Sequence, residues 1–269
     1  MRVHLHGDEK AGDFSRVLLD IGNGALPVND HGLIPVRPNW AIAVNNIEEL
    51  YSKVYPNLSQ NYTNFIWLCE RAILAPRNDM VEITNNYLLS QLPGREKVYS
   101  SIDSVVDPQE AVNYPVEFLN SLQPSGVPPH KLKLKIGCPI MLLRNLDVPT
   151  LCNGTQLVVK QMMPRVLEAT ILTGPGAGTD VFIPRIPLMP SDMPFDFKRL
   201  QFPVRISFAM SINKAQGHTL KVVGLNLETR GFSHGQLCVG CSQVGCRDNI
   251  FVFAPHSMTN NVVYPGALQ

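Results

Sequence analysis

Residues 71–94 read RAILAPRNDMVEITNNYLLSQLPG, and this stretch decides the fold class of the chain. The apolar run 71–75 ends at Pro76, which is typical of a short buried strand. Asn78 or Asp79 can cap a helix directly afterwards, and apolar residues then recur at helical spacing until a proline and a glycine end it. A strand, a tight polar turn and an amphipathic helix predict an α/β domain.

Similar patterns lie on both sides of this unit. Apolar residues at helical spacing predict helices over residues 14–21 and 47–54. Further along the chain, apolar runs predict strands over residues 204–209, 222–227, 237–240 and 250–254. Residues 212–216 are expected to form the turn after the first of these strands. The α/β pattern therefore occupies both ends of the chain.

The pattern changes in the middle of the chain. Connectors rich in proline, glycine and serine occupy residues 102–129 and indicate a domain boundary. The stretch HKLKLKI at 130–136 then alternates lysines with apolar residues, so that the lysines line one face of a strand. Short strands separated by turns follow at 139–143, 155–160, 167–172 and 180–184, which is typical of a small antiparallel barrel.

These changes predict a domain organisation with an insertion. We expect residues 1–101 and 191–269 to form one α/β domain. Residues 102–190 are expected to form a small β domain inserted into it, together with its connectors.

Charge is distributed unevenly over the 269 residues, although the net charge is only +1. Residues 1–130 carry nine basic and 15 acidic residues, whereas residues 131–214 carry 11 basic and five acidic ones. A basic middle segment suggests a surface that faces a polyanion, and uneven solvation of surface charge is the alternative.

Composition argues against membrane and secreted classes. No apolar run approaches the roughly 18 residues that span a bilayer. The first ten residues contain charges where a signal peptide needs an apolar stretch. Without a secretory signal, the six cysteines point to free thiols in a reducing compartment. We therefore expect an intracellular protein without a membrane segment.

The phosphate-binding motif G-x-x-x-x-G-K-[ST] does not occur in the sequence. Gly7 and Gly12 have the required separation, but Asp13 and Phe14 follow them. These residues therefore contain no phosphate-cradling loop that ends in a lysine.

The most specific segments are FAMSINKAQGHTL at 208–220 and FSHGQLCVGCSQVG at 232–245. They resemble motifs V and VI of the PIF-type DNA helicases, in the branch carried by Helitron transposons. The stretches 70–94, 114–159 and 198–205 agree with this resemblance, which covers nearly the whole chain. It corresponds only to the second motor half of the family.

The resemblance implies a fold and an activity. The fold is a RecA-like second motor domain with an inserted Src-homology-3-like barrel, the 2B domain. The family couples hydrolysis of ATP with Mg²⁺ to 5′-to-3′ translocation on single-stranded DNA, which implies a nuclear location. ATP lies between two motor domains, and the first one, with its phosphate loop, would lie upstream of residue 1. We expect no cofactor bound by this chain alone and infer no obligate oligomer; a separate first motor domain is a possible partner.

The resemblance also implies roles for single residues. Gln216 and Gly217 would face the ATP cleft, and Arg2 stands where the family places its motif IV arginine, although a surface arginine is the alternative. Contacts to single-stranded DNA would come from short polar side chains and one cation: Ser211, Asn213, Thr219 and Lys214. A solvated lysine is the alternative for Lys214.

Motif VI departs from the family pattern at one position. The family has an arginine that acts as a finger on the γ-phosphate, and this chain has Gln243 there. Glutamine carries no charge and cannot replace a guanidinium fork. Loss of such a finger typically costs about 10³–10⁵ in turnover, and the half with the phosphate loop is absent from these residues, so we expect this chain to be inactive alone.

Two further clusters have competing interpretations. Lys131, Lys133, Lys135 and Arg144 form a candidate DNA surface on the β domain, or else a solvated strand face. The spacing of His234, Cys238, Cys241 and Cys246 fits four zinc ligands, or else a buried strand with Cys238 and Cys241 on opposite faces.

Three functions thus stand beside one another. The preferred one is the C-terminal part of an ATP-dependent helicase. The second is a non-catalytic nucleic-acid-binding module or a decaying transposon remnant, and the third is a zinc-stabilised interaction protein.

Overall fold

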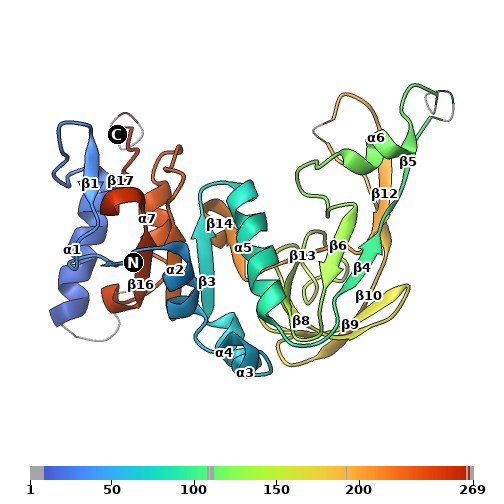
Figure 1. Ribbon diagram of the computed structural model, residues 1–269, viewed down its shortest axis with the longest axis horizontal. Helices are drawn as coiled ribbons and strands as arrows, with labels where there is room; N and C mark the ends of the chain where they lie inside the picture. Colours follow the sequence, from blue (N-terminus) through green and yellow to red (C-terminus); the bar gives the residue numbers. More distant parts are fainter. Residues whose placement is uncertain (1–8, 108, 110–111, 192, 265, 267–269) are drawn as a thin grey trace. The chain divides into compact units, whose positions relative to one another are not determined.

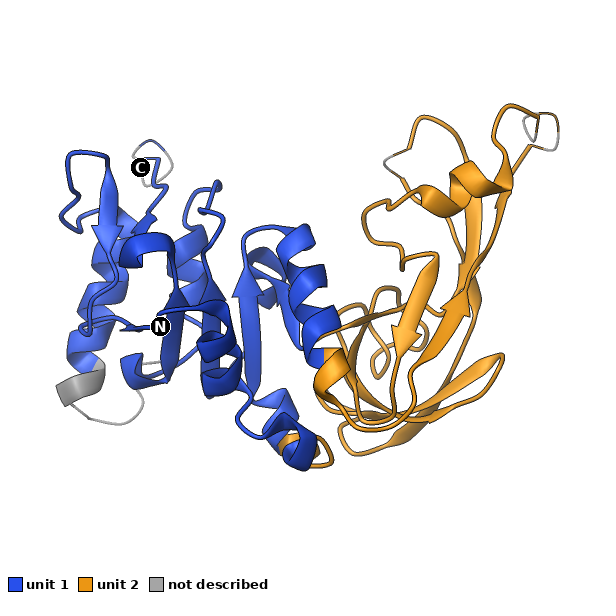
Figure 2. Cartoon of the chain, viewed as in Figure 1, with its two compact units in different colours: residues 1–61, 67–88, 208–269 blue, residues 62–66, 89–207 orange. Residues whose placement is uncertain are grey.

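The computed structural model describes residues 9–107, 109, 112–191, 193–264 and 266, and these form two compact units (Figure 2). Unit 1 consists of the described residues within 1–61, 67–88 and 208–269, and unit 2 of those within 62–66 and 89–207. Unit 1 is therefore discontinuous in sequence, and most of unit 2 lies between its second and third segments.

The boundaries of the insertion differ from the predicted 102 and 190. Strand β4 (Lys97–Ser100) pairs with β6 (Lys131–Leu134), and β13 (Val204–Ile206) pairs with β7 (Pro139–Leu142). Both outer strands therefore belong to unit 2, because their hydrogen-bonding partners lie inside it.

Unit 1 is built on a parallel sheet with the strand order β14-β3-β15-β16-β2 (Figure 1). A separate antiparallel pair joins β1 to β17. The bounds of these strands are β1 Leu33–Pro35, β2 Ile42–Ala43, β3 Arg71–Ala75, β14 Ala209–Ser211, β15 Val222–Asn226, β16 Ile250–Phe253 and β17 Met258–Asn260. Strands buried on both faces in this way read as continuous apolar runs, as β3 does.

Helices cover both faces of this sheet. A Cβ on Gly224 of β15 would meet the side chains of Val54 and Leu50 on α2, which places α2 on the face to which Gly224 points. α1 packs against α7 on the other face, as the contacts of Gly240 described below require. The α-helices that lie wholly or mostly in unit 1 are α1 Glu9–Asn23, α2 Ile47–Val54, α3 Leu58–Asn61, α4 Phe65–Cys69, α5 Asn78–Gln91 and α7 Gln236–Cys241; residues 65–66 of α4 and 89–91 of α5 fall in unit 2. None of the helices in the described residues is long and apolar enough to cross a membrane.

Several predicted elements are confirmed with close bounds. The predicted helices over 14–21 and 47–54 are α1 and α2, and α2 begins where expected because the Asn46 side chain accepts a hydrogen bond of 2.7 Å from the Glu49 backbone N–H. The predicted strand over 71–75 is β3, and the helix after it is α5.

The predicted strand over 204–209 is two strands in the structure. β13 belongs to unit 2 and β14 to unit 1. The second strand is held in unit 1 by Asn85 of α5, whose side-chain amide donates to the Ala209 carbonyl at 3.0 Å and accepts from the Ala209 N–H at 2.8 Å. The chain therefore returns to unit 1 at a point tied to the helix from which it left.

Unit 2 is antiparallel throughout its described strand pairs. A larger sheet has the order β10-β9-β8-β7-β13, a smaller one has β11-β12-β5, and β4 pairs with β6. The bounds of the elements not yet given are β5 Ile102–Val105, α6 Val116–Ser121, β8 Gln156–Met162, β9 Val166–Ile171, β10 Asp180–Pro184, β11 Ile186–Leu188 and β12 Phe197–Gln201. Four of the strands predicted between 139 and 184 are thereby confirmed.

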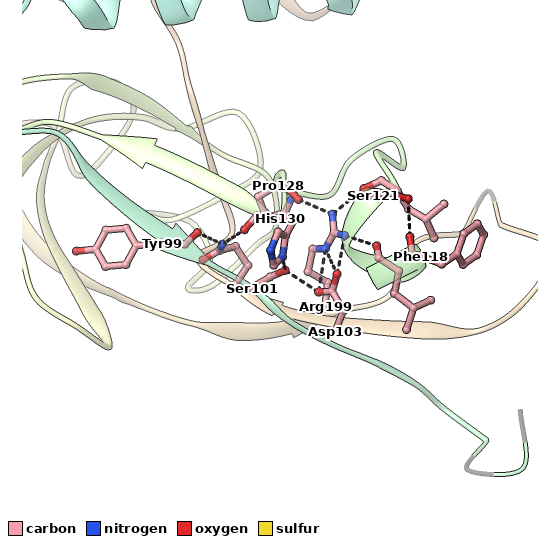
Figure 3. Close-up of polar contacts among 11 residues, drawn as sticks. Tyr99, Ser101, Asp103, Phe118, Ser121, Pro128, His130 and Arg199 are labelled. Atoms are coloured by element: carbon pink, nitrogen blue, oxygen red, sulfur yellow. Dashed lines mark hydrogen bonds and ion pairs between the residues drawn. The ribbon is translucent and has the colours of Figure 1, made fainter. Parts of the chain in front are cut away.

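A fully buried ion pair lies in the core of unit 2 (Figure 3). The Arg199 guanidinium contacts the Asp103 carboxylate at 2.7 Å, and both side chains have no exposed surface. The remaining N–H groups of the Arg199 guanidinium donate to backbone carbonyl oxygens of one segment: Leu119 at 2.9 Å, Leu122 at 3.1 Å and Pro128 at 3.2 Å. Ser101 completes the cluster by donating to Asp103 at 2.7 Å. The pair thus fixes α6 and the segment after it to β5 and β12.

Candidate functional site

Most of the predicted site residues of unit 1 lie on the segment after β14. A short 3₁₀ turn, η3 (Ile212–Ala215), follows the strand, and its two end residues are buried and anchor it. Polar residues between and beyond these anchors reach the surface: Asn213, Lys214, Gln216 and Thr219 are exposed and Ser211 is half-buried. The structure therefore presents five predicted residues on one accessible segment.

Backbone conformation and charge further define this segment. Gly217 has a φ of 93°, in the left-handed region that favours glycine, so the chain can turn sharply there. Burial lowers the pKa of His218, which leaves its ring neutral at pH 7. Lys214 is consequently the charged side chain of residues 209–220.

The predicted strand over 237–240 is wrong, because Gln236–Cys241 forms the helix α7. A helix of only six residues has too few positions to show a helical repeat, so its apolar run resembles a buried strand. Gly240 lets this helix approach closely: a Cβ there would lie 3.0 Å from Leu225 of β15 and 3.8 Å from Ile212 of η3. Motif VI therefore packs directly on the turn of motif V.

Gln243 follows α7 and is buried, with 5% of its surface exposed. Its side-chain amide donates to the Val239 carbonyl at 2.7 Å, while its side-chain oxygen is buried with no hydrogen-bond partner. Its backbone carbonyl accepts from the Leu220 N–H at 2.9 Å. The ends of the two motifs are thus joined, but the side chain at this position turns back onto its own helix and offers no charge.

Gln236 was not predicted as a site residue, although it organises this region. Its side-chain oxygen accepts from the backbone N–H groups of Phe232 at 3.1 Å and Ser233 at 3.5 Å. Its amide donates to the Pro76 carbonyl at 3.5 Å, directly after β3. The only signal in the sequence was a polar residue at the start of an otherwise apolar run.

The predicted row of three lysines on unit 2 contains only two. Lys131 and Lys133 are exposed on β6, opposite Ser100 and Val98 of β4. Lys135 lies beyond the end of β6 and is 9% exposed, because the strand stops at residue 134 and the alternation stops with it. The ammonium group of Lys135 instead donates to the Leu92 carbonyl at 2.7 Å and the Ser90 carbonyl at 3.3 Å.

The two predicted arginines have different outcomes. Arg144 is half-buried just after β7, and a Cβ on Gly126 would lie 3.8 Å from its guanidinium. Arg2 lies outside the described residues.

The candidate zinc ligands are engaged in other contacts. Cys238 lies on α7 and its thiol donates to the Leu18 carbonyl at 3.6 Å, while Cys241, one turn further, is buried, which raises the pKa of its thiol. His234 accepts a hydrogen bond from the Tyr264 N–H at 2.9 Å. Within the described residues, no group of three or more His, Cys, Asp or Glu side chains is placed to hold a metal ion. The buried-strand alternative is also wrong, since these cysteines lie on a helix.

Comparisons with known proteins find matches in one family of helicases. The family model "DNA helicase Pif1, 2B domain" matches residues 117–162, which lie in unit 2. The chain is 33% identical over 177 residues to the ATP-dependent DNA helicase PIF1 of Danio rerio, an alignment that covers 63% of this chain and 25% of that protein. It is 32% identical over 134 residues to the ATP-dependent DNA helicase PIF6 of Trypanosoma brucei brucei, covering 46% and 16%. The chain thus spans about a quarter or less of the length of these curated relatives.

Solved structures show the same fold. The Pif1 helicase from Candida albicans matches with a TM-score of 0.52 and 22% identity, over 77% of this chain and 52% of that one. The Pif1 helicase from Bacteroides in complex with ADP-AlF3 and ssDNA matches with a TM-score of 0.56 and 19% identity, over 91% and 49%. These comparisons show that the chain is similar to the C-terminal region of the PIF-type helicases, with a 2B-domain match in unit 2 and a fold shared with solved Pif1 helicases.

Proposed function

We propose that these residues form the second motor domain and the 2B domain of an ATP-dependent DNA helicase that moves 5′ to 3′ along single-stranded DNA, in the nucleus. The observation that carries the proposal is the joining of motif V to motif VI in unit 1. The hydrogen bond between Leu220 and Gln243 and the packing of Gly240 against Ile212 hold the exposed motif V segment against α7. Curated relatives named as ATP-dependent DNA helicases support this assignment.

The DNA-binding role rests on exposed polar and cationic groups. Asn213, Lys214 and Thr219 offer hydrogen-bond donors at the surface of unit 1, and Lys131 and Lys133 offer two ammonium groups on unit 2. Such groups bind phosphate oxygens without reading sequence, as a translocating motor requires. A Pif1 structure described as bound to ssDNA supports this choice of ligand.

The residues present do not fit a complete ATP site. The sequence has no phosphate-binding loop ending in a lysine, and Gln243 is uncharged and buried. The exposed Gln216 and Gly217 are the groups that we assign to the nucleotide side of motif V. We therefore propose that these residues alone do not hydrolyse ATP.

Two assays on the purified chain test this proposal. The first measures Mg²⁺-dependent ATP turnover with and without single-stranded DNA, and we expect none above the buffer control. The second measures anisotropy of a labelled oligo-dT over a range of salt concentrations. Exchanging both Lys131 and Lys133 for glutamate should lower the slope of log affinity against log salt by about 1.4, since each phosphate contact contributes about 0.7 on a single strand. Lys53→Glu, at an exposed lysine of unit 1, is the matched control.

The buried, uncharged Gln243 favours a second candidate, a non-catalytic nucleic-acid-binding module or a transposon remnant. Fusing the chain to the C-terminal end of the first motor domain of a PIF-type helicase distinguishes the two candidate functions. A motor predicts DNA-dependent ATP turnover that rises by about 10³ or more with Gln243→Arg, because a finger is restored. A module predicts DNA binding with no turnover in either fusion.

A further inference from the structure

An aromatic cluster lies on the surface of unit 2 and contains none of the site residues described above. The rings of Tyr114 and Phe195 stack with centroids 4.0 Å apart, and the Phe118 ring lies 6.2 Å from that of Phe195. Phe118 is 44% exposed. We call Tyr114, Phe118 and Phe195 the aromatic platform. Large apolar side chains that gather on a surface in this way mark an interaction site.

The platform is held rigidly from below. Phe118 lies on α6, and Leu119 of the same helix is 1% exposed. The buried Arg199 guanidinium holds the carbonyl oxygens of Leu119 and Leu122, and Figure 3 shows the Phe118 ring pointing away from this guanidinium. A side chain displayed on a fixed helix loses little further freedom on binding, so the platform is preorganised for a ligand.

Charge around the platform is acidic, in contrast to the basic segment that contains most of unit 2. Residues 102–126 contain four acidic and no basic residues, and residues 186–197 contain two acidic and no basic ones. Among the described residues, Asp107, Glu117 and Asp196 are exposed in these two segments. Lys198 follows them, but the alternation of β12 places it on the face opposite Phe197 and Arg199.

This combination distinguishes between classes of ligand. Carboxylates repel the phosphates of a nucleic acid, whose bases would otherwise stack on exposed rings. The same carboxylates attract ammonium and guanidinium groups, and the rings offer apolar contact. We propose that the aromatic platform is a docking site for a basic, apolar segment of a partner protein.

The test uses the whole chain and a defined probe. The probe is a fluorescein-labelled helical peptide of lysine and leucine, and its binding is measured by anisotropy beside that of a glutamate–leucine peptide and an oligo-dT. We expect saturable binding of the lysine peptide, with Phe118→Ala and Glu117→Lys each weakening it about tenfold, as loss of an interface anchor does.

Matched controls distinguish binding at the platform from nonspecific binding elsewhere on the chain. Ile102→Ser removes an apolar residue that is 64% exposed on the other face of β5, and Glu96→Lys reverses an exposed charge outside the two acidic segments. Both should bind the lysine peptide as the parent chain does, and thermal melting should show every variant folded. The proposal is overturned by equal losses in the controls, by tighter binding of oligo-dT that depends on Phe118, or by self-association in sedimentation that Phe118→Ala abolishes.

Discussion

Arg199 in unit 2 and Gln243 in unit 1 are both buried polar side chains, and they differ in how far their hydrogen bonds are completed. All three guanidinium nitrogens of Arg199 donate to a carboxylate or a backbone carbonyl. Gln243 has a partner for its amide nitrogen and none for its side-chain oxygen. Completed polar groups fix a fold, and incomplete ones can be exchanged at little cost.

This difference separates a position on which the fold depends from one on which it does not. Arg199 holds three carbonyl groups in place and has no surface with which to meet a ligand. Gln243 is the residue that we propose to occupy the arginine position of motif VI, and its incomplete hydrogen bonding indicates that the local structure does not depend on it. The following predictions test this contrast in order of decreasing effect.

The largest effect is expected for Arg199→Met. The change leaves the Asp103 carboxylate buried without its charge partner and frees three carbonyl oxygens. We expect the free energy of unfolding to fall by about 3–5 kcal/mol, measured by urea denaturation. Arg165→Met, at an exposed arginine, serves as the control, and an equal loss there would contradict the assignment.

Lys135→Met should have the next largest effect. The ammonium group caps carbonyl groups at the end of α5, where a helix leaves its last carbonyls unpaired and its dipole favours a cation. We expect a loss of about 1.5–3 kcal/mol by the same denaturation assay, with oligo-dT affinity per folded molecule unchanged. Lys133→Met should show the reverse pattern of unchanged stability and weaker binding.

A buried thiol gives a smaller, pH-dependent effect. Burial raises the pKa of Cys138 to about 12, from an ordinary value of 9.0. Above pH 9 the unfolded chain therefore releases a proton that the folded chain keeps, so stability falls as pH rises from 9 toward 12. The slope from this group approaches about 1.4 kcal/mol per pH unit.

Denaturation at several alkaline pH values checks this slope. Cys138→Ala should reduce the slope by up to about 1.4 kcal/mol per pH unit and leave the part that other buried groups, such as Cys241, contribute. Cys152→Ala, which removes a half-buried thiol, is the control. An identical slope in all three proteins would show that other groups cause the loss.

The smallest effect is expected for Gln243→Met. Methionine keeps the length of the side chain and removes a buried oxygen that has no partner, in exchange for one hydrogen bond to Val239. We expect the free energy of unfolding to change by less than about 1 kcal/mol in either direction. A loss as large as that of Arg199→Met would show that this position carries the fold.

Much of the fold could be predicted from local patterns. β3 and α2 were predicted because the apolar run 71–75 and the helical spacing over 47–54 are strong signals and Asn46 caps the helix. The break inside 204–209 could not be predicted, since the chain passes there from one unit to the other without losing its apolar character. The helix α7 was missed because six residues are too short for periodicity to tell helix from strand.

The candidate site was predicted unequally. The motif V residues reach the surface together because they follow a buried strand on a short turn, which sequence order alone suggests. The prediction of an exposed lysine row was wrong for Lys135, because the strand ends one residue earlier. The end of a strand is set by pairing partners distant in sequence, which a local pattern does not contain. The hydrogen bonds of Gln236 connect residues far apart in the chain, so no local pattern contains them.

The two hydrogen bonds between Asn85 and Ala209 have a consequence for how such chains diversify. They join the two ends of the long segment between residues 85 and 209, and the entropy cost of closing a loop grows only slowly with its length. Inserted segments of very different length between these two residues should therefore cost similar amounts of stability. Recombination that cuts at these two points would exchange the inserted domain and leave the parallel sheet intact.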